Sequence, residues 1–79
     1  MTEPLFSLSQ LEVGQTAVIA RLDLIGPLRR RFLDMGLLPG ETITAERVAP
    51  LGDPVEFSIK GYRLSLRRAD IGQVLIRRA

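Results

Sequence analysis

GPLRRRFLDMGLLPG, residues 26–40, has the features of one short helix with both of its ends marked. Proline suits the first turn of a helix, because its missing N–H would be unbonded there and its fixed φ is already helical. Apolar residues at 28, 32 and 35 recur with helical spacing and share one face. Gly36 can adopt the left-handed conformation that ends a helix, and Pro39-Gly40 turns the chain away. The pattern predicts a helix over residues 27–36, which must pack on something because so short a helix is unstable alone in water.

The remaining segments alternate between apolar and polar residues, as short strands do. In the first of them, Thr16, Val18, Ala20 and Leu22 are predicted to share one side of the strand. The dipeptide Lys60-Gly61 is a tight-turn signal between two later segments. The predicted strands are residues 15–22, 42–49, 55–60, 62–67 and 74–76, with a bulge near Arg47 in the second.

Two further short turns are expected. Ser7 is a plausible helix N-cap, and Gln10 three residues later completes the pattern of a capping box, so residues 7–14 are predicted to hold a single helical turn. Asp70 is predicted to cap a second turn that ends at Gly72. Between these, residues 49–54 contain two prolines, a glycine and an aspartate, which is the composition of a stiff loop.

Five short strands with one helix after the first of them predict a mainly β protein, a small and strongly bent antiparallel barrel. Closing such a sheet hides strand edges that would otherwise be open to pairing. The 79 residues form one predicted domain, 1–79. A chain of this size buries roughly 60–65% of its unfolded surface, enough for a small core but not for a deep substrate cavity.

The composition removes most kinds of catalytic site. The chain has no histidine and no cysteine, so it lacks imidazole acid–base chemistry, thiol nucleophiles and the usual ligands of transition metals. The nearest carboxylate pairs along the chain are separated by loops or by strand alternation, and no glycine-rich segment continues into the Gly-Lys-Ser/Thr of a phosphate loop. We therefore expect a binding or regulatory module and not an enzyme, with no catalytic, cofactor or metal residues.

Charge is spread along the chain. Eleven lysines and arginines against nine acids give a formal net charge of +2. Arginines cluster only at 29–31, 67–68 and 77–78, and aromatic residues, which would stack on bases, are scarce. These features favour a solvated surface over a nucleic-acid-binding face. The N-terminal residues lack the pattern of a secretory signal and no segment has 18 apolar residues, so a cytoplasmic location is expected.

Three features are candidates for binding a partner. Leu37 and Leu38 follow the predicted end of the helix, where they are either core residues or, in one case, an exposed anchor. Arg29 and Arg30 belong to a run that is either a solvated helix face or a charge match for an acidic surface or for lipid headgroups. The stiff loop 49–54 is the third candidate, although a plain structural turn is the better interpretation.

Three blocks of the sequence together resemble a known family. They are Arg31-Phe-Leu-Asp-Met-Gly-Leu-Leu-Pro-Gly40, Ala49-Pro-Leu-Gly-Asp-Pro54 and Gly61-Tyr-Arg-Leu-Ser-Leu-Arg67. In this order and spacing they are similar to the FeoA family, the small cytosolic component of bacterial ferrous-iron transport, over residues 7–77. The chain departs from many members at Asp70-Ile-Gly72, where an alanine-containing turn is common.

The resemblance implies an SH3-like barrel with a helix inserted after the first strand. It also implies a role as an accessory or regulator of FeoB, a membrane transporter with a cytosolic GTPase-like domain, and a cytoplasmic location peripheral to the inner membrane through that partner. We expect Arg29, Arg30, Leu37 and Leu38 to form the docking surface. The alternatives are a small nucleic-acid-binding barrel, or a carrier that binds Fe²⁺ weakly through carboxylates and carbonyls. Assembly into a homo-oligomer is compatible with each of these functions.

Overall fold

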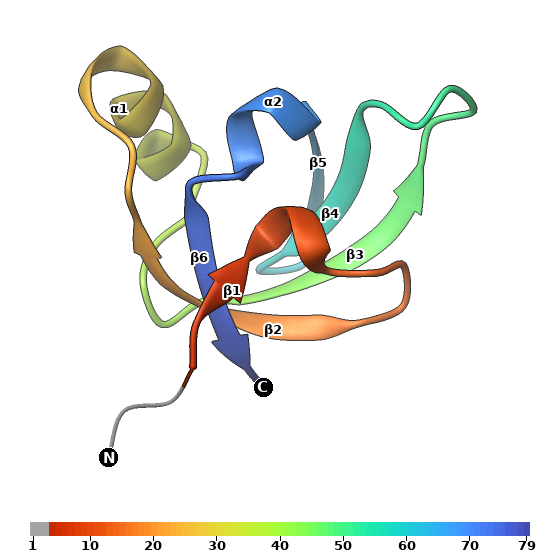
Figure 1. The fold of residues 1–79 in the computed structure, drawn as a ribbon, viewed down its shortest axis with the longest axis horizontal. Coiled ribbons are helices and arrows are strands. Elements are labelled where there is room, and N and C mark those ends of the chain that lie inside the picture. Colours follow the sequence, from red (N-terminus) through yellow and green to blue (C-terminus); the bar gives the residue numbers. More distant parts are fainter. Residues whose placement is uncertain (1–3) are drawn as a thin grey trace.

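One antiparallel sheet of six strands forms most of the molecule, and it bends strongly on itself (Figure 1). The computed structural model describes residues 4–79. Along the sheet the strands follow the order β1-β6-β2-β3-β4-β5. The elements are, in chain order, β1 Phe6–Ser7, η1 Leu8–Gln10 (a 3₁₀ turn), β2 Thr16–Leu22, α1 Gly26–Asp34, β3 Thr42–Val48, β4 Val55–Ile59, β5 Tyr62–Leu66, α2 Arg68–Ile71 and β6 Val74–Arg78.

The predicted fold class is confirmed, with two corrections. The helix follows the first long strand, as expected, but there is a sixth strand, β1, which pairs with β6 and is too short to show alternation. The two outer strands, β1 and β5, do not pair with each other, so the barrel is incomplete. At this seam η1 packs against β6 and α2, where the Ser7 hydroxyl donates to the carbonyl oxygen of Gly72 at 3.0 Å and Leu8 is fully buried, while the outer edge of β5 pairs with no strand among residues 4–79. The capping box of Ser7 and Gln10 is confirmed.

Each of the two long strands β2 and β3 contains a bulge. In β3 the register shifts between Ala45 and Arg47, which confirms the predicted bulge. In β2 the shift lies between Ile19 and Arg21, so one extra residue reverses the alternation there. The prediction that Leu22 shares a side with Thr16 is therefore wrong, because Leu22 is buried together with Ala17 and Ile19.

Helix α1 begins one residue before its predicted start and ends two residues before its predicted end. The chain leaves the helix at Met35, and Gly36 has a φ of +98°, as expected for the residue that ends it. The apolar face is also confirmed: Phe32 is fully buried, and Leu28, Leu33 and Met35 pack against the core. The buried core is Leu8, Ala17, Ile19, Leu22, Phe32, Leu37, Ile43, Ala45, Val55, Phe57, Ile59, Leu66, Ile71, Val74 and Ile76.

Hydrogen bonds close the loop 49–54 on itself, and two more tie it to α2. The Gly52 N–H donates to Ala49 O at 2.8 Å, closing a turn within the loop. The Arg68 N–H, the first of α2, donates to Asp53 Oδ1 at 3.0 Å, and Arg68 Nε donates to Gly52 O at 2.6 Å. Asp70 was expected to cap this turn, but it lies within α2, and the capping carboxylate comes from Asp53 instead.

The first strand begins and the last strand ends on the same side of the molecule. Strand β1 begins and β6 ends on the side of the barrel opposite to α1 and α2 (Figure 1). None of the helices within residues 4–79 has the length and apolar character needed to cross a bilayer.

Candidate docking surface

The two leucines after α1 have different surroundings. Leu37 is fully buried, and its N–H donates to Phe32 O at 3.1 Å, which continues the closure of the helix. Leu38 is 37% exposed. Of the alternatives left open by the sequence, Leu37 is thus a core residue, and its side chain is not available to a partner in this conformation. Leu38 is the leucine that such a surface can use.

Tyr62 adjoins this turn and was not singled out from the sequence. It opens β5, it is 43% exposed, and its hydroxyl donates to the carbonyl oxygen of Met35. The ring therefore reaches the end of α1 from a strand that lies 27 residues further along the chain. Its position just after a turn dipeptide gave no signal of this contact, because the contact depends on how α1 folds over the sheet. We call Leu38 and Tyr62, with the backbone of residues 35 and 36 between them, the Leu38–Tyr62 surface.

The rim of this surface carries a pair of opposite charges. Lys60 Nζ lies 3.3 Å from Glu41 Oε1, and the two residues flank Tyr62 and Leu38 in sequence. Both side chains are partly exposed, so the pair adds little to stability, at most about 1 kcal/mol. An exposed tyrosine and leucine with charged neighbours is the composition of a small protein-binding patch.

Arg29 and Arg30 are exposed and lie in the first half of α1, where they border a shallow hollow with Gly26 and Pro27. Arg31 is turned toward α2, with its Nη2 atom 4.0 Å from Asp70 Oδ2. The structure therefore places the predicted arginines within α1, beside one hollow, and Leu38 four residues beyond the end of the helix.

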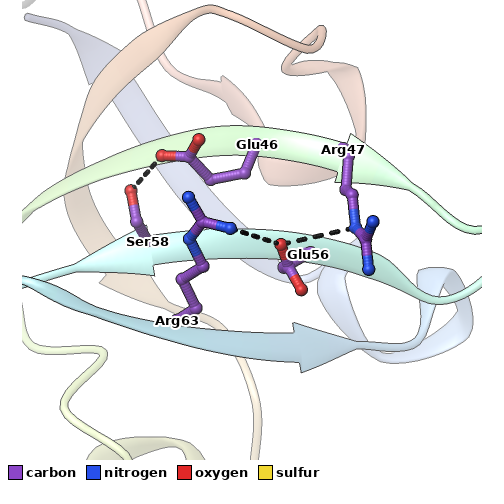
Figure 2. A network of polar contacts seen from close by, with 5 residues as sticks. All are labelled: Glu46, Arg47, Glu56, Ser58 and Arg63. Carbon is purple, nitrogen blue, oxygen red and sulfur yellow. Dashed lines mark hydrogen bonds and ion pairs between the residues drawn. The ribbon is translucent and has the colours of Figure 1, made fainter.

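The carboxylates of β3 and β4 are paired with cations or hydroxyls (Figure 2). Glu56 Oε1 forms an ion pair with Arg47 Nε at 3.5 Å and accepts a hydrogen bond from Arg63 Nη1 at 3.4 Å. Ser58 Oγ donates to Glu46 Oε2 at 2.6 Å on the same outer face of the sheet. The described residues contain no group of three or more His, Cys, Asp or Glu side chains that could hold a metal ion.

The loop 49–54 presents Leu51, which is 98% exposed, at its tip. A hollow at its base is lined by Arg47, Val48, Ala49, Pro50, Pro54, Glu56 and Ser65. The hydrogen bonds to Arg68 hold the loop in place, as a structural turn requires, and they do not distinguish that role from partner binding.

Comparison with known proteins identifies relatives over nearly the whole chain. The FeoA domain model matches residues 6–78. The chain is 46% identical over 67 residues to a fusion of Fe(2+) transport protein A and the Fe(2+) transporter FeoB from Porphyromonas gingivalis. That match covers 85% of this chain and 8% of the fusion protein.

Two solved structures share the fold. Iron(II) transport protein A from Clostridium thermocellum is 35% identical, with a TM-score of 0.88 over 94% of this chain and 46% of that one. FeoA from Stenotrophomonas maltophilia, solved with zinc and described as an SH3 domain protein, is 26% identical, with a TM-score of 0.78 over 94% of this chain and 99% of that one. The SH3-like fold implied by the three sequence blocks is thereby confirmed, and the chain belongs to the FeoA family.

Proposed function

We propose that this protein is a non-enzymatic accessory of ferrous-iron uptake that docks on the cytosolic GTPase-like part of a FeoB-type transporter. The observation that supports this most directly is the fused relative, in which a segment 46% identical to this chain shares one polypeptide with a transporter named FeoB. Two parts that occur in one chain operate at the same place and in fixed ratio. A separate accessory has to achieve the same association through a binding surface.

The Leu38–Tyr62 surface is the centre of the proposed contact, and Arg29 and Arg30 are its rim. The exposed Tyr62 and Leu38 provide apolar area that a partner can desolvate, and tyrosine is one of the residues that most often dominate the binding energy of an interface. The arginines are exposed and lie in α1, the helix that precedes Leu38, where they would steer association with an acidic partner surface. Through this contact the protein would be held at the cytosolic face of the inner membrane.

The test is a binding titration of the purified chain against the cytosolic part of FeoB from the same organism. Leu38→Asp is expected to weaken binding by at least about tenfold, because it places a charge in the desolvated centre of the interface. Leu51→Asp is the matched control, since Leu51 is 98% exposed and lies outside the proposed surface. Arg29→Glu with Arg30→Glu is expected to slow association, with a smaller effect at high salt.

Binding that is unchanged by Leu38→Asp, with the variant folded by circular dichroism, would reject this surface. Binding that is lost with Leu51→Asp and kept with Leu38→Asp would show that the loop 49–54 and not the Leu38–Tyr62 surface carries the contact. No binding of the wild-type chain, with or without guanine nucleotide on FeoB, would reject the proposed partner.

The two alternative functions have separate outcomes. A nucleic-acid-binding barrel would retain oligonucleotides with an affinity that falls steeply with added salt, through counterion release. An iron carrier would bind Fe²⁺ saturably in an anaerobic titration at sub-millimolar concentration. Either result, with no FeoB binding, would replace the proposed function.

A further inference from the structure

We propose that the free edge of β5 is a second binding site, which accepts an extended acidic segment of a partner as an additional strand. The site uses the backbone edge of residues 63–67, which begins one residue after Tyr62, and it does not depend on the proposed function. Strand β5 is the last strand of the sheet and pairs only with β4 (Figure 2).

The register of the β4–β5 hairpin determines which backbone groups face outward. Lys60 and Gly61 have φ values of +52° and +83°, and they form a two-residue turn between Ile59 and Tyr62. In such a hairpin the two residues that flank the turn form hydrogen bonds to each other through both their N–H and C=O groups, and every second pair of residues along the strands does the same. The backbone groups of Tyr62, Leu64 and Leu66 are therefore hydrogen-bonded to β4. The N–H and C=O groups of Arg63 and Ser65 point away from β4, to the free edge.

Those outward groups have no backbone partner among residues 4–79. The alternation continues to Arg67, whose backbone is still extended, with φ −76° and ψ 141°. The free edge thus offers a template from residue 63 to residue 67. Beyond these points the edge is closed, because Tyr62 contacts the end of α1 and α2 begins at Arg68.

The side chains along this template favour an acidic strand. Arg63 is 66% exposed, and within residues 4–79 its one ion pair is with Glu56 at 3.4 Å, a weak pair that can rearrange. Arg67 is exposed and lies on the same side by the strand alternation. Leu64 lies between them on the inner side and is only partly buried against the core. The best match is therefore a strand with acids opposite 63 and 67, a small polar residue opposite Ser65, and an apolar residue opposite Leu64.

The same charges disfavour a second copy of this chain as the occupant. Two β5 strands paired edge to edge would gather four arginines, at 63 and 67 of each copy, on one short ribbon. Like charges that face each other across a strand pair are destabilising. Arginines on an edge strand protect it against self-pairing, and here they also select the partner.

The probe is a capped peptide of the sequence Gly-Ser-Glu-Val-Thr-Val-Glu-Ser-Gly, titrated into ¹⁵N-labelled protein to millimolar concentration. We expect saturable shifts of the amide signals of Arg63 and Ser65, and hydrogen exchange at both amides that slows by at least about threefold. In the free protein these two amides should exchange faster than those of Tyr62, Leu64 and Leu66, which are bonded to β4.

Ser65→Pro is the decisive variant. It removes an outward N–H without removing a bond to β4, and proline is tolerated on an edge strand in that position. The variant is expected to fold and to lose peptide binding, whereas Ser65→Ala retains it. A second pair of variants keeps the test informative if the proline disturbs folding. Arg63→Glu with Arg67→Glu should bind the peptide with lysines in place of its two glutamates and no longer bind the acidic one.

Four outcomes would overturn the proposal. The first three are no shift at millimolar peptide, shifts that persist unchanged in Ser65→Pro, and binding of the lysine peptide by the wild-type chain as strong as that of the acidic one. Amide shifts at Arg63 and Ser65 that depend on protein concentration alone would also overturn it, because the occupant would then be a second copy.

Discussion

Gly36 shows how one residue joins the helix to the sheet. Its φ of +98° is a backbone angle that residues with a side chain rarely adopt, and a Cβ built at this position would collide with the Tyr62 hydroxyl. Glycine is therefore needed twice at this position, once for the turn that ends α1 and once for the approach of Tyr62. The first requirement could be predicted from the sequence, since a glycine follows an apolar helical pattern. The second could not, because it depends on a residue from another strand.

We expect Gly36→Ala to lower the free energy of unfolding by about 2–3 kcal/mol, from backbone strain together with the collision. Gly40→Ala is the matched control, because Gly40 has a φ of +94° but nothing lies within 4 Å of its added Cβ. The free energy of unfolding of the Gly40→Ala variant should fall by only about 1 kcal/mol. In a Tyr62→Phe background the cost of Gly36→Ala should fall toward that of the control, as measured by urea unfolding. Equal costs in the two backgrounds would contradict the role of the hydroxyl.

At the scale of elements, α2 depends on a loop that is distant in sequence. The helix has four residues and no capping side chain of its own at Arg67. Its first N–H is bonded instead by Asp53, 15 residues earlier, while the Arg68 side chain returns a bond to Gly52. The sequence indicated a stiff loop and a short turn separately, but local capping rules assigned the cap to Asp70. Such rules cannot identify a cap that comes from a different segment.

Asp53→Ala is expected to cost about 1 kcal/mol of stability, the usual value of a lost helix cap. Asp53→Asn keeps an acceptor oxygen and should stay within about 0.5 kcal/mol of the wild type. Faster amide exchange at Arg68 in the alanine variant would assign the loss to α2. A loss of equal size in both variants would contradict the capping role.

At the scale of the whole molecule, stability depends on how the seam of the barrel is filled. Because β1 and β5 do not pair, η1 packs against β6 and α2 on the β6 side of the seam, and Leu8 from η1 is fully buried there. We expect Leu8→Ala to lower stability by about 2–5 kcal/mol, as for other buried leucines, which is a large part of the total for a domain of this size. Leu51→Ala removes the same atoms from a side chain that is 98% exposed and should change stability by less than about 0.5 kcal/mol. Thermal unfolding of both variants measures the difference.

How far the sequence predicts this molecule also depends on scale. The alternation of Val55, Phe57 and Ile59 was sufficient to predict β4, and all three are buried. The short strand β1 was missed because two residues are too few to show an alternation of apolar and polar side chains. Leu22 was assigned to the wrong face of β2 because the bulge in that strand is determined by its pairing with β6. Local patterns therefore predicted the fold class, whereas tertiary pairing determined which exposed residues are neighbours. The Leu38–Tyr62 surface could not be predicted for this reason, because it depends on tertiary pairing.

The positions at which the sheet begins and ends have a consequence for tethering. Strand β1 starts and β6 finishes on the side opposite α1 and α2, so a linker attached at either place would leave α1 and its following turn uncovered. Joining two binding modules by a short flexible linker gives an effective concentration of the order of millimolar. A contact with a dissociation constant of about 1 mM, negligible between free molecules in dilute solution, would then be occupied about half of the time. The geometry of this barrel therefore suits a surface that binds negligibly when free and is occupied for a substantial part of the time when tethered.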